Sequence, residues 1–94
     1  METLQSKLEQ SVQDTFKRVE EKSNVIALVN LSNNSSLKKQ CKLISMIKTI
    51  IIKSLQIGNY KRVLLYLISL NKILDNLEKE EEYIMTKMSD IIFH

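Results

Sequence analysis

A chain of 94 residues has room for one small domain, and its composition restricts the fold of that domain. Proline is absent and glycine occurs once, at Gly58, so the residues that most often interrupt helices are nearly missing. The apolar fraction is 44%, aromatic residues make up only 5%, and the net charge is +3. This scarcity of proline and glycine argues against the many tight turns of a sandwich or barrel. We therefore predict an all-α fold in a single helical domain over residues 1–94.

The first predicted helix covers residues 3–31. Heptad spacing relates two rows of side chains, one of Val12, Val19 and Ile26 and the other of Leu8, Thr15, Lys22 and Val29. This is the pattern of a coiled-coil seam, although Thr15 and Lys22 weaken it because they are polar. A loop rich in Ser and Asn follows at 32–36, and Ser35 or Ser36 is expected to cap the next helix.

The second predicted helix, 37–57, has apolar side chains on two adjacent faces. One face has Leu37, Cys41, Ile44, Ile47 or Lys48, Ile51 and Leu55, and the other has Leu43, Met46, Ile50 and Ile57. So wide an apolar surface predicts a helix packed against two neighbours. Gly58 is expected to end this helix in the left-handed conformation, and Asn59 to cap the next one. The short connection predicts an antiparallel hairpin of the second and third helices, over residues 37–93.

The third predicted helix, 60–93, has the most regular pattern in the chain. Spacings of four and three residues alternate, with Glu81 as the one interruption, along Val63, Leu67, Leu70, Leu74, Leu77, Glu81, Ile84, Met88 and Ile91. The first five of these residues form the predicted core seam. Helix 37–57 is too short to cover the second half. We therefore expect a partner interface, partly exposed in a single copy, at Glu81, Ile84, Met85, Met88, Ile91, Ile92 and Phe93. The predicted architecture is an elongated three-helix bundle with coiled-coil character, in which helix 3–31 runs parallel to helix 60–93.

Positive charge is concentrated in the middle of the chain. Helix 37–57 contains lysines but no Asp or Glu, and the candidate basic surface consists of Lys38, Lys39, Lys42, Lys53, Lys61 and Arg62. Three interpretations stay open: a solvated face, a contact with an acidic protein, or binding of nucleic acid or an anionic membrane surface. The lack of interleaved aromatic residues argues against stacking on nucleic-acid bases.

The sequence contains no recognisable set of catalytic or metal-ligating residues. His94 is the only histidine and ends the chain, so neither a Ser-His-Asp set nor a His-based metal site can be assembled around it. Cys41 is the only cysteine and is expected to act as a small apolar side chain. No secretory signal or membrane span is recognisable, so an intracellular location, cytoplasmic or nuclear, is expected. We expect no enzyme activity, cofactor or small-molecule substrate.

The segment Gly58–Leu67 has a Gly-x-Tyr turn that opens a helix of alternating apolar residues. In this it resembles the helix-turn-helix junction of microtubule-interacting-and-trafficking domains and of tetratricopeptide hairpins. The resemblance to the first family implies a three-helix bundle that binds peptide helices in a groove. The long heptad helix at the N-terminus and the scarcity of alanine depart from both families.

Three functional hypotheses follow from these features. The first is a non-enzymatic interaction protein, a small coiled-coil subunit or adaptor that assembles with itself or with other helical proteins. The second is a peptide-binding module of the microtubule-interacting-and-trafficking type, with its groove between the second and third helices. The third is a basic module that binds nucleic acid or anionic lipid, and whose binding would weaken steeply with salt.

Overall fold

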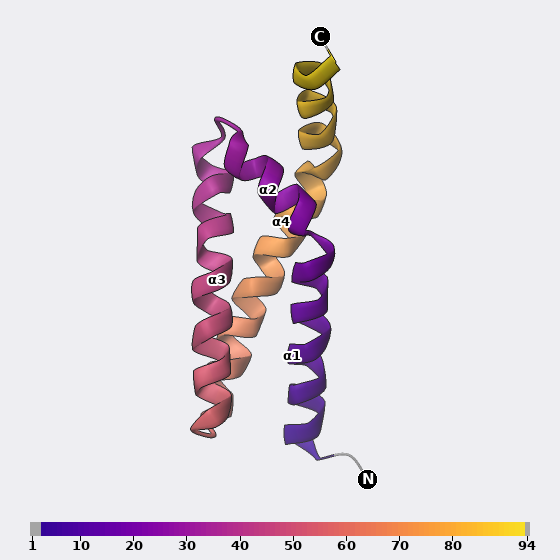
Figure 1. Cartoon of the computed structure of the whole chain (residues 1–94). Coiled ribbons are helices and arrows are strands. Elements are labelled where there is room, and N and C mark those ends of the chain that lie inside the picture. The colour runs from indigo at the N-terminus through magenta and orange to yellow at the C-terminus, as the bar shows by residue number, and fades with distance from the viewer. Residues whose placement is uncertain (1–2, 94) are drawn as a thin grey trace.

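The computed structural model describes the backbone of residues 3–93 and the side chains of residues 3–87. This part of the chain forms four helices and no strand, namely α1 (Leu4–Glu21), α2 (Ser23–Leu31), α3 (Ser35–Gln56) and α4 (Tyr60–Phe93). The prediction of an all-α fold is confirmed, whereas the count of three helices is wrong because residues 3–31 form two helices. Figure 1 shows α1 and α3 on either side of α4, with α2 crossing from the end of α1 to the start of α3.

The break between α1 and α2 lies at Lys22, where the backbone has φ −97° and ψ 10°. Its amide donates to both Arg18 O and Val19 O, at 3.2 and 3.1 Å, which tightens the last turn of α1. Beyond the break Val25 is buried in place of Ile26, which would continue the row through Val19 at heptad spacing, whereas Val29 keeps its predicted position. The change of direction at Lys22 therefore lets α2 bury its own apolar face.

The caps of α3 and α4 come from asparagine side chains. Asn34 Oδ1 accepts a hydrogen bond from Leu37 N at 3.1 Å, so α3 begins at Ser35 and its cap is Asn34 rather than Ser35 or Ser36. Asn59 Oδ1 accepts from Arg62 N at 3.2 Å and caps α4, as predicted.

The turn between α3 and α4 is a Schellman motif around Gly58, whose φ of +73° is the conformation predicted for it. The amide of Asn59 donates to Ser54 O at 2.9 Å, and that of Gly58 to Leu55 O at 3.1 Å. Only glycine adopts this backbone without strain, so the turn fixes the end of α3. From here α4 runs back along α3 in the opposite direction (Figure 1).

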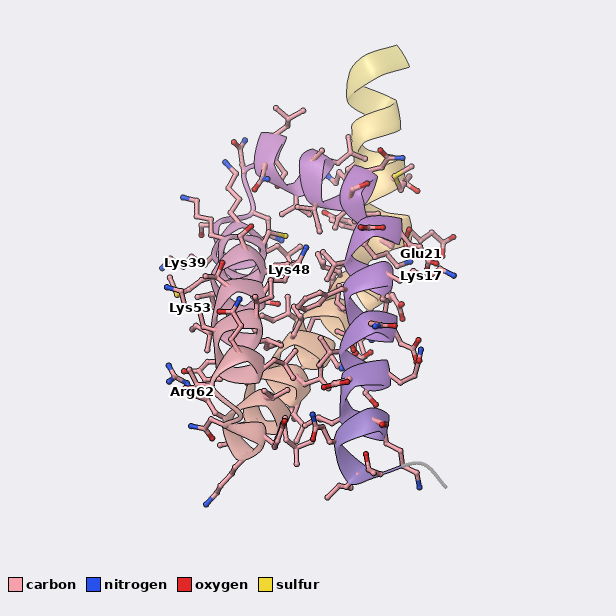
Figure 2. All side chains as sticks on the ribbon, turned by 60° about the horizontal axis from the view of Figure 1, so that its bottom comes forward. Lys17, Glu21, Lys39, Lys48, Lys53 and Arg62 are labelled. Atoms are coloured by element: carbon pink, nitrogen blue, oxygen red, sulfur yellow. The ribbon has the colours of Figure 1, made fainter. Side chains whose placement is uncertain are left out.

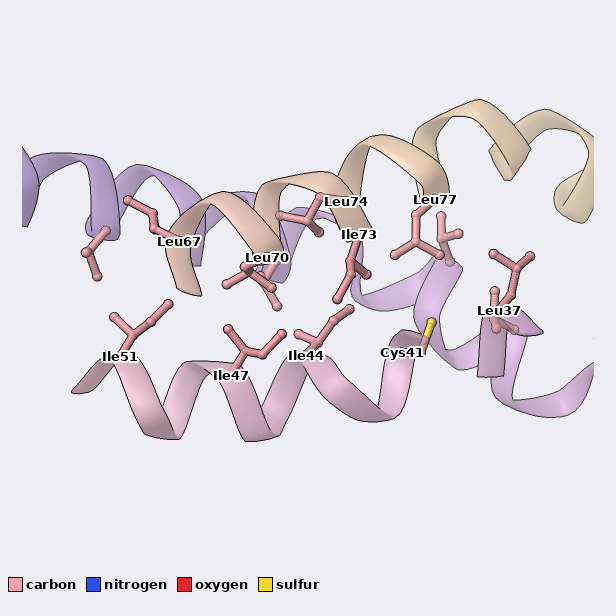
Figure 3. Close-up of a cluster of buried hydrophobic side chains, with 14 of the residues drawn as sticks. Leu37, Cys41, Ile44, Ile47, Ile51, Leu67, Leu70, Ile73, Leu74 and Leu77 are labelled. Atoms are coloured by element: carbon pink, nitrogen blue, oxygen red, sulfur yellow. The ribbon is translucent and has the colours of Figure 1, made fainter. Parts of the chain in front are cut away.

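The core lies where α4 meets the other helices. Val63, Leu67, Leu70, Leu74 and Leu77, the predicted core seam, are all 5% exposed or less. Figure 3 shows the side chains of α4 lying against a row from α3, whose labelled members are Leu37, Cys41, Ile44, Ile47 and Ile51. Removing this apolar surface from water is the main stabilising contribution to the fold.

Candidate interaction surfaces

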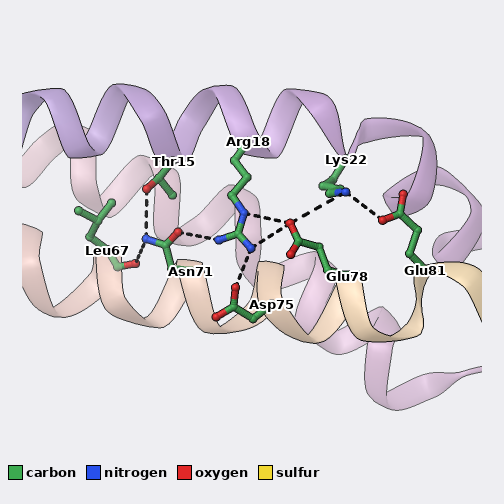
Figure 4. Close-up of polar contacts among 8 residues, drawn as sticks. All are labelled: Thr15, Arg18, Lys22, Leu67, Asn71, Asp75, Glu78 and Glu81. Carbon is green, nitrogen blue, oxygen red and sulfur yellow. Dashed lines mark hydrogen bonds and ion pairs between the residues drawn. The ribbon is translucent and has the colours of Figure 1, made fainter.

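Helix α1 buries Val12 and Val19 in the core, and a row of polar side chains also joins it to α4 (Figure 4). At its centre, Arg18 donates to Asp75 Oδ1 at 2.6 Å, to Asn71 Oδ1 at 2.9 Å and to Glu78 Oε1 at 3.2 Å. The hydrogen bond to Asp75 is the largest cause that raises the pKa of Arg18 above its ordinary value. Arg18 therefore connects three residues on successive turns of α4.

Two further contacts extend this row in both directions. Asn71 Nδ2 donates to the buried Thr15 Oγ1 at 3.1 Å and to Leu67 O at 3.0 Å. On the other side, Lys22 Nζ donates to Glu81 Oε2 at 2.9 Å, which is the main reason that the pKa of Lys22 is raised. Residues later in α1 pair with residues later in α4, so the two helices run parallel.

These contacts change the interpretation of three residues. Thr15 and Lys22 interrupt the apolar pattern of α1, and Glu81 interrupts that of α4, but the structure pairs all three across the same contact. Glu81, a member of the predicted partner interface, thus has a partner within its own chain. Sequence reasoning missed this row because it took each polar residue singly as an interruption.

The predicted partner interface is only partly available at the surface. Ile84 was expected to be partly exposed in a single copy, and this is wrong, since it is 6% exposed. Ile84 lies beside Leu31 and Ser32 at the end of α2, the helix that the sequence did not separate from α1. Met85 is exposed, at 48%. The four remaining members have side chains outside the described residues, and they are Met88, Ile91, Ile92 and Phe93.

The predicted basic residues lie on the outer sides of α3 and of the first turn of α4. Lys39, Lys42, Lys53, Lys61 and Arg62 are exposed, and Lys38 is half-buried. Figure 2 shows Lys39, Lys53 and Arg62 at the edge of the molecule away from α1. Lys48 differs, because its ammonium lies 5.1 Å from the centre of the Phe16 ring of α1.

Large apolar side chains remain exposed on α3 and α4. A contiguous row of exposed apolar side chains is unusual on a protein surface and marks a candidate interaction site. On α3, Leu43 is 42% exposed, Met46 59% and, at its C-cap, Ile57 71%. On α4, Leu64, Leu65, Ile68, Tyr83 and Met85 are exposed to between 48% and 58%. One of the two apolar faces predicted for residues 37–57 is therefore not covered by the described side chains.

Two hollows lie between pairs of long helices. A groove of about 540 Å³ opens between the first turns of α1 and α4, where Leu4, Leu8 and Leu64 line it beside Lys7 and Lys61. A smaller hollow of about 250 Å³ lies between α3 and α4, with mostly polar walls that include Gln40, Asn76 and Glu80.

The described residues contain no group of three or more His, Cys, Asp or Glu side chains placed to hold a metal ion. Burial raises the pKa of the Cys41 thiol, which keeps it in its unreactive protonated form. Over the same residues, no helix has the length and apolar character needed to cross a membrane.

Comparison of the chain with protein-family models, with curated proteins and with solved structures returned no match. The inference of function therefore rests on the surfaces described above.

Proposed function

We propose that this protein is a non-enzymatic helical interaction protein, a small subunit or adaptor that assembles with itself or with other helical proteins through coiled-coil contacts. The observation that carries the proposal is the length of α4. With 34 residues it spans about 51 Å at 1.5 Å per residue, and α3 has only 22 residues. Its C-terminal part extends beyond the ends of α2 and α3 (Figure 1).

The side chains at this end support a protein contact. Tyr83 and Met85 are 58% and 48% exposed on α4, and Leu31 at the end of α2 is 75% exposed. In the sequence, the spacing of four and three residues continues beyond Ile84 through Met88 and Ile91. An apolar pattern that continues past the end of the bundle favours packing against a helix of another molecule.

The experiment is the solution mass of the purified chain over a concentration series, with helicity recorded on the same samples. We expect a helical dimer or larger species that dissociates on dilution. The double change Tyr83→Asp and Met85→Asp places one charge on each side of the row that runs through Ile84, and it should yield a folded monomer. The matched control is Leu4→Asp, an exposed leucine at the opposite end, which should leave the mass unchanged. A wild-type chain that is a folded monomer at every concentration would exclude self-assembly.

The peptide-groove alternative has weaker support. It requires an apolar groove between the second and third predicted helices, and the hollow between α3 and α4 is small and mostly polar. An amphipathic peptide helix binds through an apolar groove, so such walls offer it little. The larger apolar groove lies instead between α1 and α4.

A further inference from the structure

Helix α3 has two apolar faces, and the described side chains, those of residues 3–87, cover only one of them. The covered face includes Ile44, Ile47 and Ile51, each 6% exposed or less. The second face, here called the α3 stripe, consists of Leu43, Met46, Ile50 and Ile57. Of these, Ile50 is half-buried and the other three are exposed. The inference below rests on the proposed function, and it identifies the chemistry of one partner.

The spacing of the α3 stripe fits one helix better than a flat surface. Leu43, Met46, Ile50 and Ile57 are separated by three, four and seven residues, and Lys39 and Lys53 occupy the positions that complete the repeat. A stripe restricted to these two heptad positions is narrow, as in a coiled-coil seam. A membrane surface would favour a broader apolar face than this.

The charge around the α3 stripe has one sign. From Ser23 to Leu74 the chain contains no Asp or Glu, and its basic residues are Lys38, Lys39, Lys42, Lys48, Lys53, Lys61, Arg62 and Lys72. Every ion pair between described residues involves Arg18 or Lys22, so none of the α3 lysines is paired with a described carboxylate. Unneutralised positive charge therefore lies within the row of the stripe, at Lys39 and Lys53, as well as around it.

This charge argues against a second copy as the occupant of the stripe. Two α3 helices packed together would bring lysines of both copies into one contact, and like charges at an interface are destabilising. The described carboxylates lie on α1 and α4, where Glu78 and Glu81 are engaged by Arg18 and Lys22 and Glu80 and Glu82 are exposed, so a second copy could face the lysines only through a different helix. Nucleic acid is also a poor fit, because an aliphatic stripe offers its bases no aromatic stacking.

We propose that the α3 stripe binds an amphipathic helix of another protein, with aliphatic residues at its contact positions and Asp or Glu beside them. Its apolar side chains pack between those of Leu43, Met46 and Ile57. Its carboxylates face Lys39 and Lys53 of α3 and Arg62 of α4, which lie at the same edge of the molecule (Figure 2).

The probe is a labelled synthetic helix of three heptads with Leu at positions a and d and Glu at e and g, whose own charges oppose self-association. The control peptide has Lys in place of each Glu. Binding to the full chain is measured by fluorescence anisotropy. We expect the acidic peptide to bind at least about tenfold more tightly than the basic one, and less tightly as salt increases.

Two variants locate the binding. Met46→Glu should weaken binding of the acidic peptide by at least about tenfold, because it places a carboxylate in the stripe. Leu64→Glu changes a similarly exposed side chain on the side of α4 that faces α1, and should change affinity by less than about twofold. Both sites are exposed, so circular dichroism should report the wild-type fold for both proteins.

Equal binding of both peptides, or of the wild type and Met46→Glu, would overturn the proposal. A Met46→Glu change that turned an oligomer into a monomer would overturn it too, because the stripe would then be covered by a second copy. Vesicles with and without phosphatidylserine test the lipid surface, and binding to them that Met46→Glu abolishes, without peptide binding, would assign the stripe to membranes. A monomeric wild type that still binds the acidic peptide would refute self-assembly and leave this inference standing.

Discussion

Helix α4 makes two contacts of opposite chemical character. Against α3 it presents Leu70, Ile73 and Leu77 to a row of aliphatic side chains (Figure 3). Against α1 it presents Asn71, Asp75, Glu78 and Glu81 to polar and basic partners (Figure 4). The apolar contact contributes most of the stability, because burial of aliphatic surface is non-directional and proportional to area.

The polar contact fixes the position of α1 along α4 more than it stabilises the fold. Arg18 and Lys22 pair with carboxylates whose side chains are between 36% and 59% exposed, and such pairs stabilise weakly. They are directional, however, and they favour one parallel register of α1 on α4. We infer that burial of Val12 and Val19 holds α1 on the bundle and that the polar contacts set its register on α4.

The largest effect is expected from a charge in the apolar contact. Leu74 is 0% exposed, so Leu74→Asp buries an unpaired carboxylate and should cost at least about 4 kcal/mol, enough to unfold a domain of this size. Circular dichroism should show loss of the cooperative thermal transition. The matched control is Leu65→Asp on the same helix, which is 58% exposed and should melt as the wild type does. A cooperative Leu74→Asp protein would mean that the contact of α3 with α4 is not the stable core.

A smaller effect is expected in the polar contact, where a double-mutant cycle measures the interaction of two side chains. Thr15→Val removes the acceptor of Asn71 Nδ2 and leaves one amide hydrogen unpaired, at a cost of about 1–2 kcal/mol. Replacing both partners, by Thr15→Val with Asn71→Leu, should cost less than the sum of the single changes. The measurement is urea unfolding of the four proteins. Additive costs would show that the two side chains do not interact.

The two contacts also differ in how far the sequence predicts them. Alternating spacings of four and three residues identify the apolar positions of α4, because burial imposes its period on the sequence. The polar contact has no such signal within one helix. It could have been found only by aligning α1 and α4 in parallel, since Thr15 lies 56 residues before Asn71 and Lys22 lies 59 before Glu81.

The break at Lys22 and the cover over Ile84 were also missed, and for related reasons. No proline or glycine marks the break, and its one sequence signal is the change of register between Val19 and Val25. The sequence pattern predicts one continuous helix over residues 3–31, and such a helix leaves Ile84 at the surface. Tertiary packing of α2, rather than local helix preference, decided both outcomes.

The smallest effect expected is a pH dependence within the apolar contact, at Cys41. Burial raises the pKa of its thiol above the ordinary value of 9.0, so above pH 9.0 the unfolded chain releases this proton more readily than the folded chain does. The folded state then holds more protons than the unfolded state, and stability falls as pH rises. Lys22 acts in a higher range, because its raised pKa keeps its contribution present below 10.5 and loses it above.

Between pH 9.0 and 10.5, the effect of the Cys41 thiol on stability can therefore be measured apart from that of the Lys22 ammonium. Urea unfolding of the wild type and of Cys41→Ala across this window gives the comparison, and slopes are compared because the variant has a lower starting stability. We expect the wild type to lose stability faster with rising pH than Cys41→Ala. Parallel profiles would mean that water reaches the Cys41 sulfur, and that the contact of α3 with α4 is less tightly closed at this point than its neighbours Ile44 and Ile47 imply.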